Sequence, residues 1–178
     1  MTRSRLVIGL GSPDRGDDAI GTVVALRVEA LGLPGVTVIV HEDPTALIDL
    51  WSGVDLAVVV DAVRSGAPAG QVLLVETGAG APALADQAWA RTGRGGTHAF
   101  GLAAAVELGR ALGRLPARLV VVGVEGADFE HGAPLSGAVA SAVDSVVGTV
   151  VGTVVDAVSG TVAGHLTPDE AVVPGVPR

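Results

Sequence analysis

The chain of 178 residues contains no cysteine and no tyrosine, and it has only two tryptophans, two phenylalanines and one methionine. The lack of cysteine excludes disulfide bonds, thiolate zinc sites and a cysteine nucleophile. Because aromatic side chains are scarce while about half of the residues are hydrophobic, the core must be built from valine, alanine and leucine. This length suits one domain with a core of its own.

Positive charge and long apolar runs are also lacking. The formal net charge of −8 argues against a nucleic-acid surface, which is normally basic, and is compatible with attraction of cations or a basic peptide. The first apolar run, Leu6–Leu10, is too short for a signal peptide, and no convincing run approaches the roughly 20 residues of a membrane span. We therefore expect a soluble, cytoplasmic protein that contacts neither nucleic acid nor membrane.

Strands and helices are predicted to alternate along most of the chain. Strands are expected at Arg5–Leu10, Gly35–Asp43, Val54–Ala62, Gly70–Glu76 and Arg118–Glu125. Helices are expected at Asp17–Leu31, Thr45–Trp51 and His98–Gly113, with a loop of at most one helical turn over Thr77–Thr97. This alternation predicts an α/β fold, a three-layer helix–sheet–helix sandwich whose sheet is five-stranded, twisted and mostly parallel. Sites in such sheets form at the carboxyl ends of the strands.

The segment Ser136–Val158 carries two conflicting signals. Its β-branched residues and glycines favour a strand by local propensity. Its valines, however, recur at three- and four-residue steps, at Val143, Val146, Val147, Val150, Val151, Val154, Val155 and Val158. This period predicts a helix with one apolar face. Residues 1–159 are thus expected to form a single domain, and the proline-containing tail 160–178 to be poorly ordered.

A glycine-rich loop, GLGSPDRGDDAIG at Gly9–Gly21, joins the first strand to the first helix. Gly11 and Gly16 have the spacing of a nucleotide P-loop, but Asp17 and Asp18 replace the residues that would hold phosphate and magnesium. The dinucleotide fingerprint also fails, because its third glycine is missing. Two carboxylates would repel a phosphate, and no organic cofactor is expected. By itself the loop is equally compatible with Asp17 capping the helix and Asp18 favouring its dipole.

Three side chains of metal-ligand type are expected at the edge of the sheet where a site should form. Asp18 begins the first helix, Asp61 ends the third strand, and His98 begins the helix after the long loop. A carboxylate after a run of apolar residues is costly unless it is hydrogen-bonded or bound to metal. Two carboxylates and an imidazole suit a borderline cation such as nickel or zinc. The residues alone leave open loop hydrogen bonding by Asp61 and a capping or surface role for His98.

Three motifs extend this interpretation. They are GLGSPDRGDDAIG, then VVVDAV followed by a glycine-rich turn and the strand GQVLLVE, and then THAFGL. Together with VVVGVEGADFE they resemble, in order and separation, the motifs of the hydrogenase maturation endopeptidases, over roughly Arg5–Val143. Members of that family remove a C-terminal extension from the large-subunit precursor of nickel–iron hydrogenases. The resemblance also implies the family fold, a five-stranded twisted sheet between helices of the phosphorylase/hydrolase-like kind.

The resemblance implies that Asp18, Asp61 and His98 contact the nickel already inserted into the precursor, so that cleavage follows metal loading. Nickel would then arrive with the substrate, the precursor would be the protein partner, and a monomer is favoured. The chain departs from the family pattern at three places. Ser12 replaces the usual asparagine, Asp18 replaces the glutamate of many members, and HEDPTAL replaces Asp-Gly-Gly-Thr after the second strand.

Water is the expected nucleophile, because the chain has no cysteine and no Ser–His–Asp pattern. Nickel would polarise the carbonyl or the water, Asp18 or Asp61 would act as the base, and Asp17 would support their loop. Two alternatives stay open. One is a non-proteolytic, nickel-dependent assembly checkpoint, and the other is a metal-dependent hydrolase of small substrates on the same fold.

Several other residues carry weaker predictions. We expect His41, Glu42 and Asp43, at the end of the second strand, to be solvated charges rather than substrate contacts. Glu125, at the end of the fifth strand, is expected either to contact the site or to hydrogen-bond a loop. Trp51 is expected to be a packing residue.

Overall fold

The computed structural model describes residues 4–82 and 97–159, with side chains over 4–82 and 101–157. Five strands form one sheet in the order β2-β1-β3-β5-β4. They are β1 (Arg5–Leu10), β2 (Val36–His41), β3 (Leu56–Val63), β4 (Val72–Thr77) and β5 (Arg118–Glu125). All pairs are parallel except β4 with β5, which is antiparallel. The predicted five-stranded, mostly parallel sheet is confirmed.

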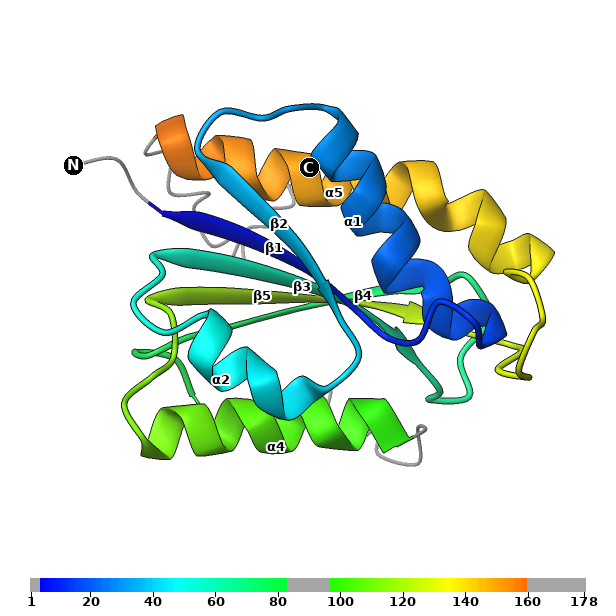
Figure 1. The fold of residues 1–178 in the computed structure, drawn as a ribbon, viewed down its shortest axis with the longest axis horizontal. Helices are drawn as coiled ribbons and strands as arrows, with labels where there is room; N and C mark the ends of the chain where they lie inside the picture. The colour runs from blue at the N-terminus through cyan, green and yellow to red at the C-terminus, as the bar shows by residue number, and fades with distance from the viewer. Residues whose placement is uncertain (1–3, 83–96, 160–178) are drawn as a thin grey trace, which may run out of the picture.

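Helices cover both faces of this sheet (Figure 1). One face carries α1 (Ile20–Ala30) and α5 (Gly137–Ser159), and the other carries α2 (Leu47–Leu50) and α4 (Thr97–Ala111). Two short 3₁₀ turns, η1 (Gly16–Ala19) and η2 (Pro44–Ala46), precede α1 and α2.

Side chains of β3 alternate between the two layers of the core. Val58 and Val60 pack with α1 and α5, whereas Val59 and Val63 pack with the layer of α2 and α4. Every residue of β3 is buried, as expected for a parallel strand covered on both faces.

Boundaries differ from the sequence expectations at two places that matter for function. The first helix was expected from Asp17, but residues 16–19 form the 3₁₀ turn η1, and the α-helix begins at Ile20. The third strand was expected at Val54–Ala62, whereas β3 runs from Leu56 to Val63, so Asp61 lies inside the strand. Leu31, expected on the apolar face of the first helix, is 54% exposed because the helix ends at Ala30.

The predicted helix over the valine-rich segment is confirmed as α5. Val143, Val146, Val150 and Val154 are buried against the sheet and α1, so the apolar period prevails over β-propensity. Val155 was placed on the same face but is 43% exposed. Among the described residues, α5 is the one helix long and apolar enough to cross a membrane, which is weak support for a span because its valine stripe lies in the core. The expected helical turn in the long loop falls mainly on residues 83–96, and the tail on 160–178; both lie outside the described residues.

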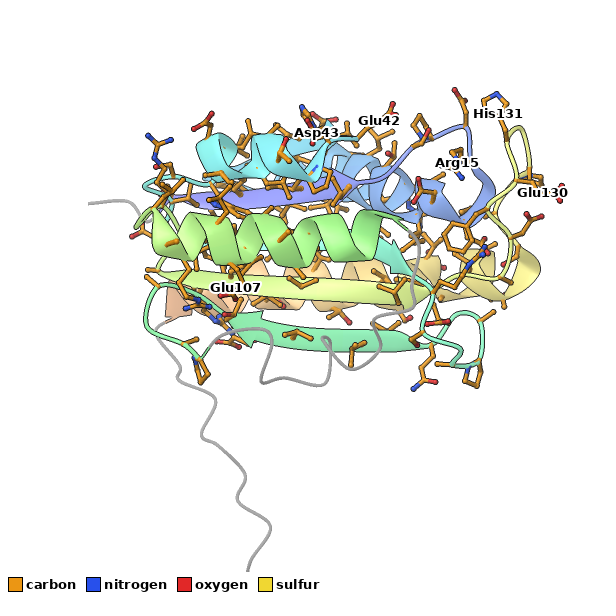
Figure 2. The ribbon with its side chains drawn as sticks, turned by 90° about the horizontal axis from the view of Figure 1, so that it is seen from below. Arg15, Glu42, Asp43, Glu107, Glu130 and His131 are labelled. Atoms are coloured by element: carbon orange, nitrogen blue, oxygen red, sulfur yellow. The ribbon has the colours of Figure 1, made fainter. Side chains whose placement is uncertain are left out.

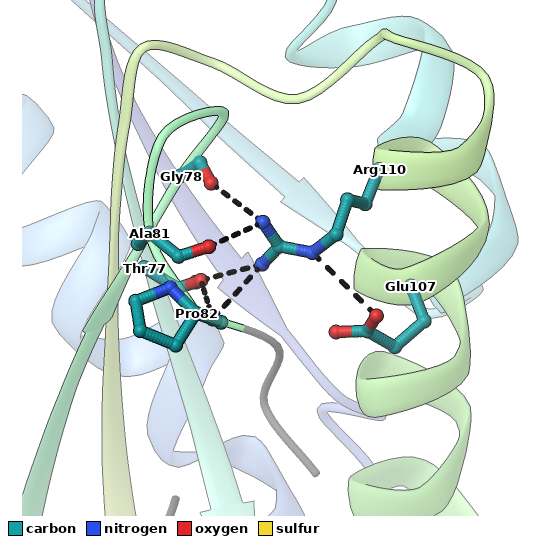
Figure 3. A network of polar contacts seen from close by, with 6 residues as sticks. All are labelled: Thr77, Gly78, Ala81, Pro82, Glu107 and Arg110. Carbon is teal, nitrogen blue, oxygen red and sulfur yellow. Dashed lines mark hydrogen bonds and ion pairs between the residues drawn. The ribbon is translucent and has the colours of Figure 1, made fainter. Parts of the chain in front are cut away.

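Arg110, near the end of α4, forms hydrogen bonds with the turn that follows β4 (Figure 3). Its guanidinium donates hydrogen bonds to the carbonyls of Gly78 (3.0 Å) and Ala81 (2.7 Å) and to Oγ1 of Thr77 (2.9 Å). Glu107, one turn earlier in the helix, forms an ion pair with it at 3.5 Å. This network lies at the edge where the parallel strands begin, opposite the edge where a site is expected.

Candidate active site

The site is expected where β1 and β3 part at the carboxyl ends of the strands. The pairing of β1 with β3 ends at Gly9 and Val60, while β3 and β5 stay paired as far as Val63 and Glu125. From β1 the chain turns to α1 on one face, whereas α2, which leads into β3, lies on the other face. Asp61 is the first residue of β3 beyond this switch in topology, where ligands bind in open α/β sheets.

Glycine brings the opening loop close to this point. A side chain at Gly21 would collide with the carbonyl oxygens of Leu10 and Val60, the latter at 2.6 Å from a Cβ atom. Gly11 has a φ of +123°, and a Cβ atom there would meet the carbonyl oxygen of Asp18. Because these positions lack side chains, η1 and the start of α1 lie directly against the ends of β1 and β3.

Asp18 is held by the backbone of its own loop. The side chain is 5% exposed, and its Oδ2 accepts a hydrogen bond of 2.8 Å from the N–H of Ser12. The position of the carboxylate therefore depends on how the turn from Ser12 to η1 is fixed.

Asp61 lies inside β3 and is fully buried. By strand alternation its side chain lies on the face of Val59 and Val63, which α4 also covers. Neither carboxylate oxygen has a hydrogen-bond partner among the described residues. The loop hydrogen bonding that the sequence left open for Asp61 is therefore not found there.

The surroundings of Asp61 disfavour its negative charge. Burial, first, and the nearby carboxylate of Asp18, second, raise the pKa of Asp61 well above its ordinary value of 3.8. The N–H of Ala62 lowers the pKa but does not offset the other two effects. Asp18 and Asp61 thus lie near enough for the charge of Asp18 to act on Asp61.

His98 lies in the first turn of α4, and its side chain is outside the described part of the chain. This end of α4 is at the carboxyl edge, because a Cβ atom at Gly101 would lie 2.8 Å from Pro44, which directly follows the β2 loop. The backbone of His98 is thus on the edge and face that Asp61 occupies. Among the side chains that the structure describes, no three of metal-ligand type gather. The convergence of His98 with the two carboxylates stays a prediction.

The loops around the pair carry exposed charges. Figure 2 shows Arg15, Glu130 and His131 at this end of the molecule and Glu107 at the other. Glu42 and Asp43 are exposed, and Asp43 accepts hydrogen bonds of 2.8 Å from the N–H and hydroxyl of Thr45, as a cap of η2. This cap fits the interpretation of the segment as solvated charges.

The family model of the HycI hydrogenase maturation proteases matches residues 42–153, more than half of the chain. The chain belongs to the hydrogenase maturation protease family. The matched range includes Asp61 and the position of His98, whereas Asp18 precedes it. A search among curated proteins gave no match.

Solved structures of maturation proteases share the fold. The maturating endopeptidase HybD of Escherichia coli is 22% identical, with a TM-score of 0.68 over 86% of this chain and 93% of that one. A solution structure of an E. coli endopeptidase is 23% identical, with a TM-score of 0.73 over 86% and 93% of the two chains. HybD of Thermococcus kodakarensis, a [NiFe] hydrogenase maturation protease, is 18% identical, with a TM-score of 0.64 over 84% and 98%.

Of the two roles considered for Asp17, capping of the helix is not observed, whereas the contacts agree with support of the loop. Its fully buried carboxylate does not cap its own helix; it accepts hydrogen bonds from the N–H groups of Ala127, Asp128 and Ser136 in the loop after β5. Burial alone would raise the pKa of Asp17, but these backbone donors hold it below its ordinary value. Nothing in the sequence near Asp17 indicates this contact, because its partners lie 110 to 119 residues away.

Glu125 fastens another loop of the maturation protease. Its carboxylate accepts hydrogen bonds from the N–H and hydroxyl of Ser65 and from the N–H of Gly66, at 2.7 to 3.0 Å. Of the two roles expected for Glu125, loop hydrogen bonding is the one observed. Trp51 is fully buried, as expected of a packing residue.

Proposed function

We propose that this maturation protease removes the C-terminal extension of a nickel–iron hydrogenase large-subunit precursor once nickel has been inserted. In this proposal Asp18, Asp61 and His98 recognise the nickel that the precursor carries. One observation supports it above the others: the buried carboxylate of Asp61 has no hydrogen-bond partner among the described residues and lies beside a second carboxylate. Membership of the family supports the activity class.

A cation would suit the carboxylate of Asp61, whose oxygens have no hydrogen-bond partner among the described residues. Two nearby carboxylates in a buried place repel each other, and an unpaired buried carboxylate is unfavourable. A divalent ion brought by the substrate would reduce the repulsion between the two carboxylates, and the carboxylate of Asp61 could serve as one of its ligands. Carboxylate oxygen and imidazole nitrogen are both acceptable ligands for nickel. The metal is therefore part of the substrate in this proposal, and no organic cofactor is required.

The same carboxylates suit the hydrolytic step. Water is the proposed nucleophile, and a carboxylate whose pKa is raised accepts a proton more readily near neutral pH than an ordinary one. Burial gives Asp61 this property. Asp61 is therefore the preferred base, while the N–H of Ser12 holds the carboxylate of Asp18 in position. Cytoplasmic location and a monomeric state remain predictions.

The test uses the large-subunit precursor from the same organism, purified with and without nickel. Each form is incubated with the protein and weighed by intact-mass spectrometry. We expect loss of a C-terminal peptide from the nickel-loaded form alone, and no loss with the Asp61→Asn or His98→Ala variants.

Other outcomes would replace the proposal. Nickel-dependent binding of the precursor without any mass change would indicate an assembly checkpoint. Hydrolysis of small esters or peptides with added metal, and without a precursor, would indicate a small-substrate hydrolase. Cleavage of both precursor forms at equal rates would contradict nickel recognition.

A further inference from the structure

Two loops that are far apart in the sequence are joined beside the carboxylate pair. One runs from Ser12 into η1, and the other, residues 126–136, connects β5 to α5. Oδ2 of Asp17 accepts hydrogen bonds from the N–H groups of Ala127 (2.7 Å) and Asp128 (3.0 Å), and Oδ1 accepts one from Ser136 (2.6 Å). The backbone adds a bond of 2.7 Å from the N–H of Asp17 to the carbonyl of Asp128.

The junction is built for a carboxylate. Three N–H groups converge on two oxygens, so an amide side chain would turn its own NH₂ group toward one of these donors. The junction is also tight. A Cβ atom at Gly126 would lie 3.0 Å from Cβ of Asp17, and Gly16, with a φ of +54°, faces the carbonyl of Asp128. We therefore expect substitution of Asp17 to shift η1 relative to the β5–α5 loop, even though backbone hydrogen bonds still join the two loops.

The turn that carries Asp18 is also joined to the β5–α5 loop by backbone hydrogen bonds, from Gly16 to the carbonyl of Ala133 (3.1 Å) and from Gly132 to the carbonyl of Asp14 (2.7 Å), but Asp17 supplies the side-chain acceptor at this junction. The turn η1 has four residues, and its N-cap residue, Arg15, makes no side-chain capping bond. A 3₁₀ turn of this length has little stability of its own. Asp61, in contrast, lies within β3 and is paired with Gly123 of β5. Of the two carboxylates, only Asp18 depends on a loop for its place.

We propose that Asp17 is a positioning residue for the cleavage reaction. It fixes η1 to the β5–α5 loop and so holds the carboxylate of Asp18 against Asp61, without itself touching the substrate. The inference rests on the proposed function for its effect on cleavage, but the positioning itself can be measured without any substrate.

The N–H of Ser12 reports directly on the position of Asp18, because it donates to Oδ2 of that residue. We would compare Asp17→Asn with a matched control, Glu125→Gln, by ¹H–¹⁵N NMR. Glu125 is also a buried carboxylate that fastens a loop at this edge, through Ser65 and Gly66. A merely structural role would lower the unfolding temperature in both variants and leave the Ser12 resonance unchanged.

The expected result is specific to Asp17. In Asp17→Asn the Ser12 amide proton moves upfield as its carboxylate acceptor is lost, and kcat for the nickel-loaded precursor falls by about tenfold or more, with KM nearly unchanged. In Glu125→Gln the Ser12 resonance stays in place and kcat stays within about twofold. The kcat values of both variants are measured well below their unfolding temperatures and are expressed per folded molecule.

An unmoved Ser12 resonance in folded Asp17→Asn would overturn the proposal. If that variant does not fold, Ala127→Pro removes one donor to Asp17 at an exposed position and is judged by the same resonance. If the wild-type protein cleaves no precursor, the proposed function fails, while the Ser12 resonance still decides whether Asp17 positions Asp18. A shifted resonance with unchanged kcat would overturn the link to catalysis.

Discussion

The two edges of the sheet differ in which charged side chains they carry and in the contacts that these side chains make. At the edge where the parallel strands begin, arginines donate to backbone carbonyls or pair with acids. Arg5 bonds the carbonyls of Pro34 (2.7 Å) and Val154 (3.0 Å), and Arg118 pairs with Glu76. At the opposite edge the buried charges are carboxylates, on Asp17, Asp18, Asp61 and Glu125.

The difference lies in which charges have partners. Each arginine at the first edge has at least one, and at the second edge Asp17 and Glu125 accept three or more hydrogen bonds each. Asp61 accepts none from the described residues. Buried polar groups that serve the fold are normally satisfied. Among the buried carboxylates of the described residues, Asp61 is the one whose oxygens have no hydrogen-bond partner, and this supports the proposal that it binds a cation of the substrate.

The largest expected effect follows from Asp61. Asp61→Asn keeps the shape of the side chain but removes its charge and its capacity to accept a proton. We expect cleavage of the nickel-loaded precursor to fall by about 100-fold or more, the range for loss of a general base, without loss of stability. Intact-mass time courses and urea unfolding at neutral pH measure the two effects. Activity within about tenfold of the wild type would contradict the role of Asp61 as the general base.

Close packing at the carboxyl edge predicts a large effect on stability. In Gly21→Ala the new methyl group would collide with the carbonyls of Leu10 and Val60, and we expect a loss of about 3 kcal/mol or more. The control is Gly32→Ala, where φ is +59° and no atom lies within 4 Å of the added carbon. That substitution should cost only about 1 kcal/mol, from the left-handed conformation. Equal losses, measured by urea unfolding, would show that the contact is relieved by movement of α1.

At the other edge, the Arg110 network should affect stability and not chemistry. Arg110→Lys keeps the charge but loses the fork that reaches the carbonyls of Gly78 and Ala81 together. We expect a loss of about 1–2 kcal/mol in unfolding free energy. The value of kcat per folded molecule should stay within about twofold. A large fall in kcat with unchanged stability would contradict this prediction and indicate that the Arg110 network takes part in the reaction.

The titration of Asp61 predicts a pH dependence of stability with a defined sign. Because its pKa is raised on folding, the unfolded state loses this proton at lower pH than the folded state does. The group therefore lowers stability progressively as pH rises above the ordinary value of 3.8 toward the folded pKa. Asp61→Asn should gain stability relative to the wild type between pH 4 and pH 8, as measured by urea unfolding. A constant difference between the two proteins would contradict the shift.

The smallest expected effect concerns Glu76, and its sign is opposite. Its hydrogen bonds to Arg118 lower its pKa below the ordinary value of 4.5, so the stabilisation is present above that pH and is lost as pH falls through the folded pKa. The side chains are 59% and 42% exposed, so solvent screening limits the gain to below about 1 kcal/mol. The small difference in stability between Glu76→Gln and the wild type should thus be fully present at pH 7 and shrink as pH falls below 4.5. A difference that grows toward low pH would contradict this assignment.

The sequence by itself determined the elements and their order. The bounds of β1 and β5 agree with the structure, and the valine period correctly placed α5, because a buried face imposes a local repeat that can be read from neighbouring residues. It also placed Asp18 and Asp61 at one edge, since the carboxyl ends of parallel strands share an edge.

Only the tertiary structure decided which charges are satisfied. The capping role that the loop alone left open for Asp17 is not observed, because its donors come from a loop more than 100 residues away, and pairing with β5 adds Val63 to the predicted third strand. Periodicity shows which side chains are buried, whereas the partners of a buried carboxylate come from segments that are distant in the chain. That Asp61 has no such partner in the described part of the chain could therefore be seen only in the folded molecule.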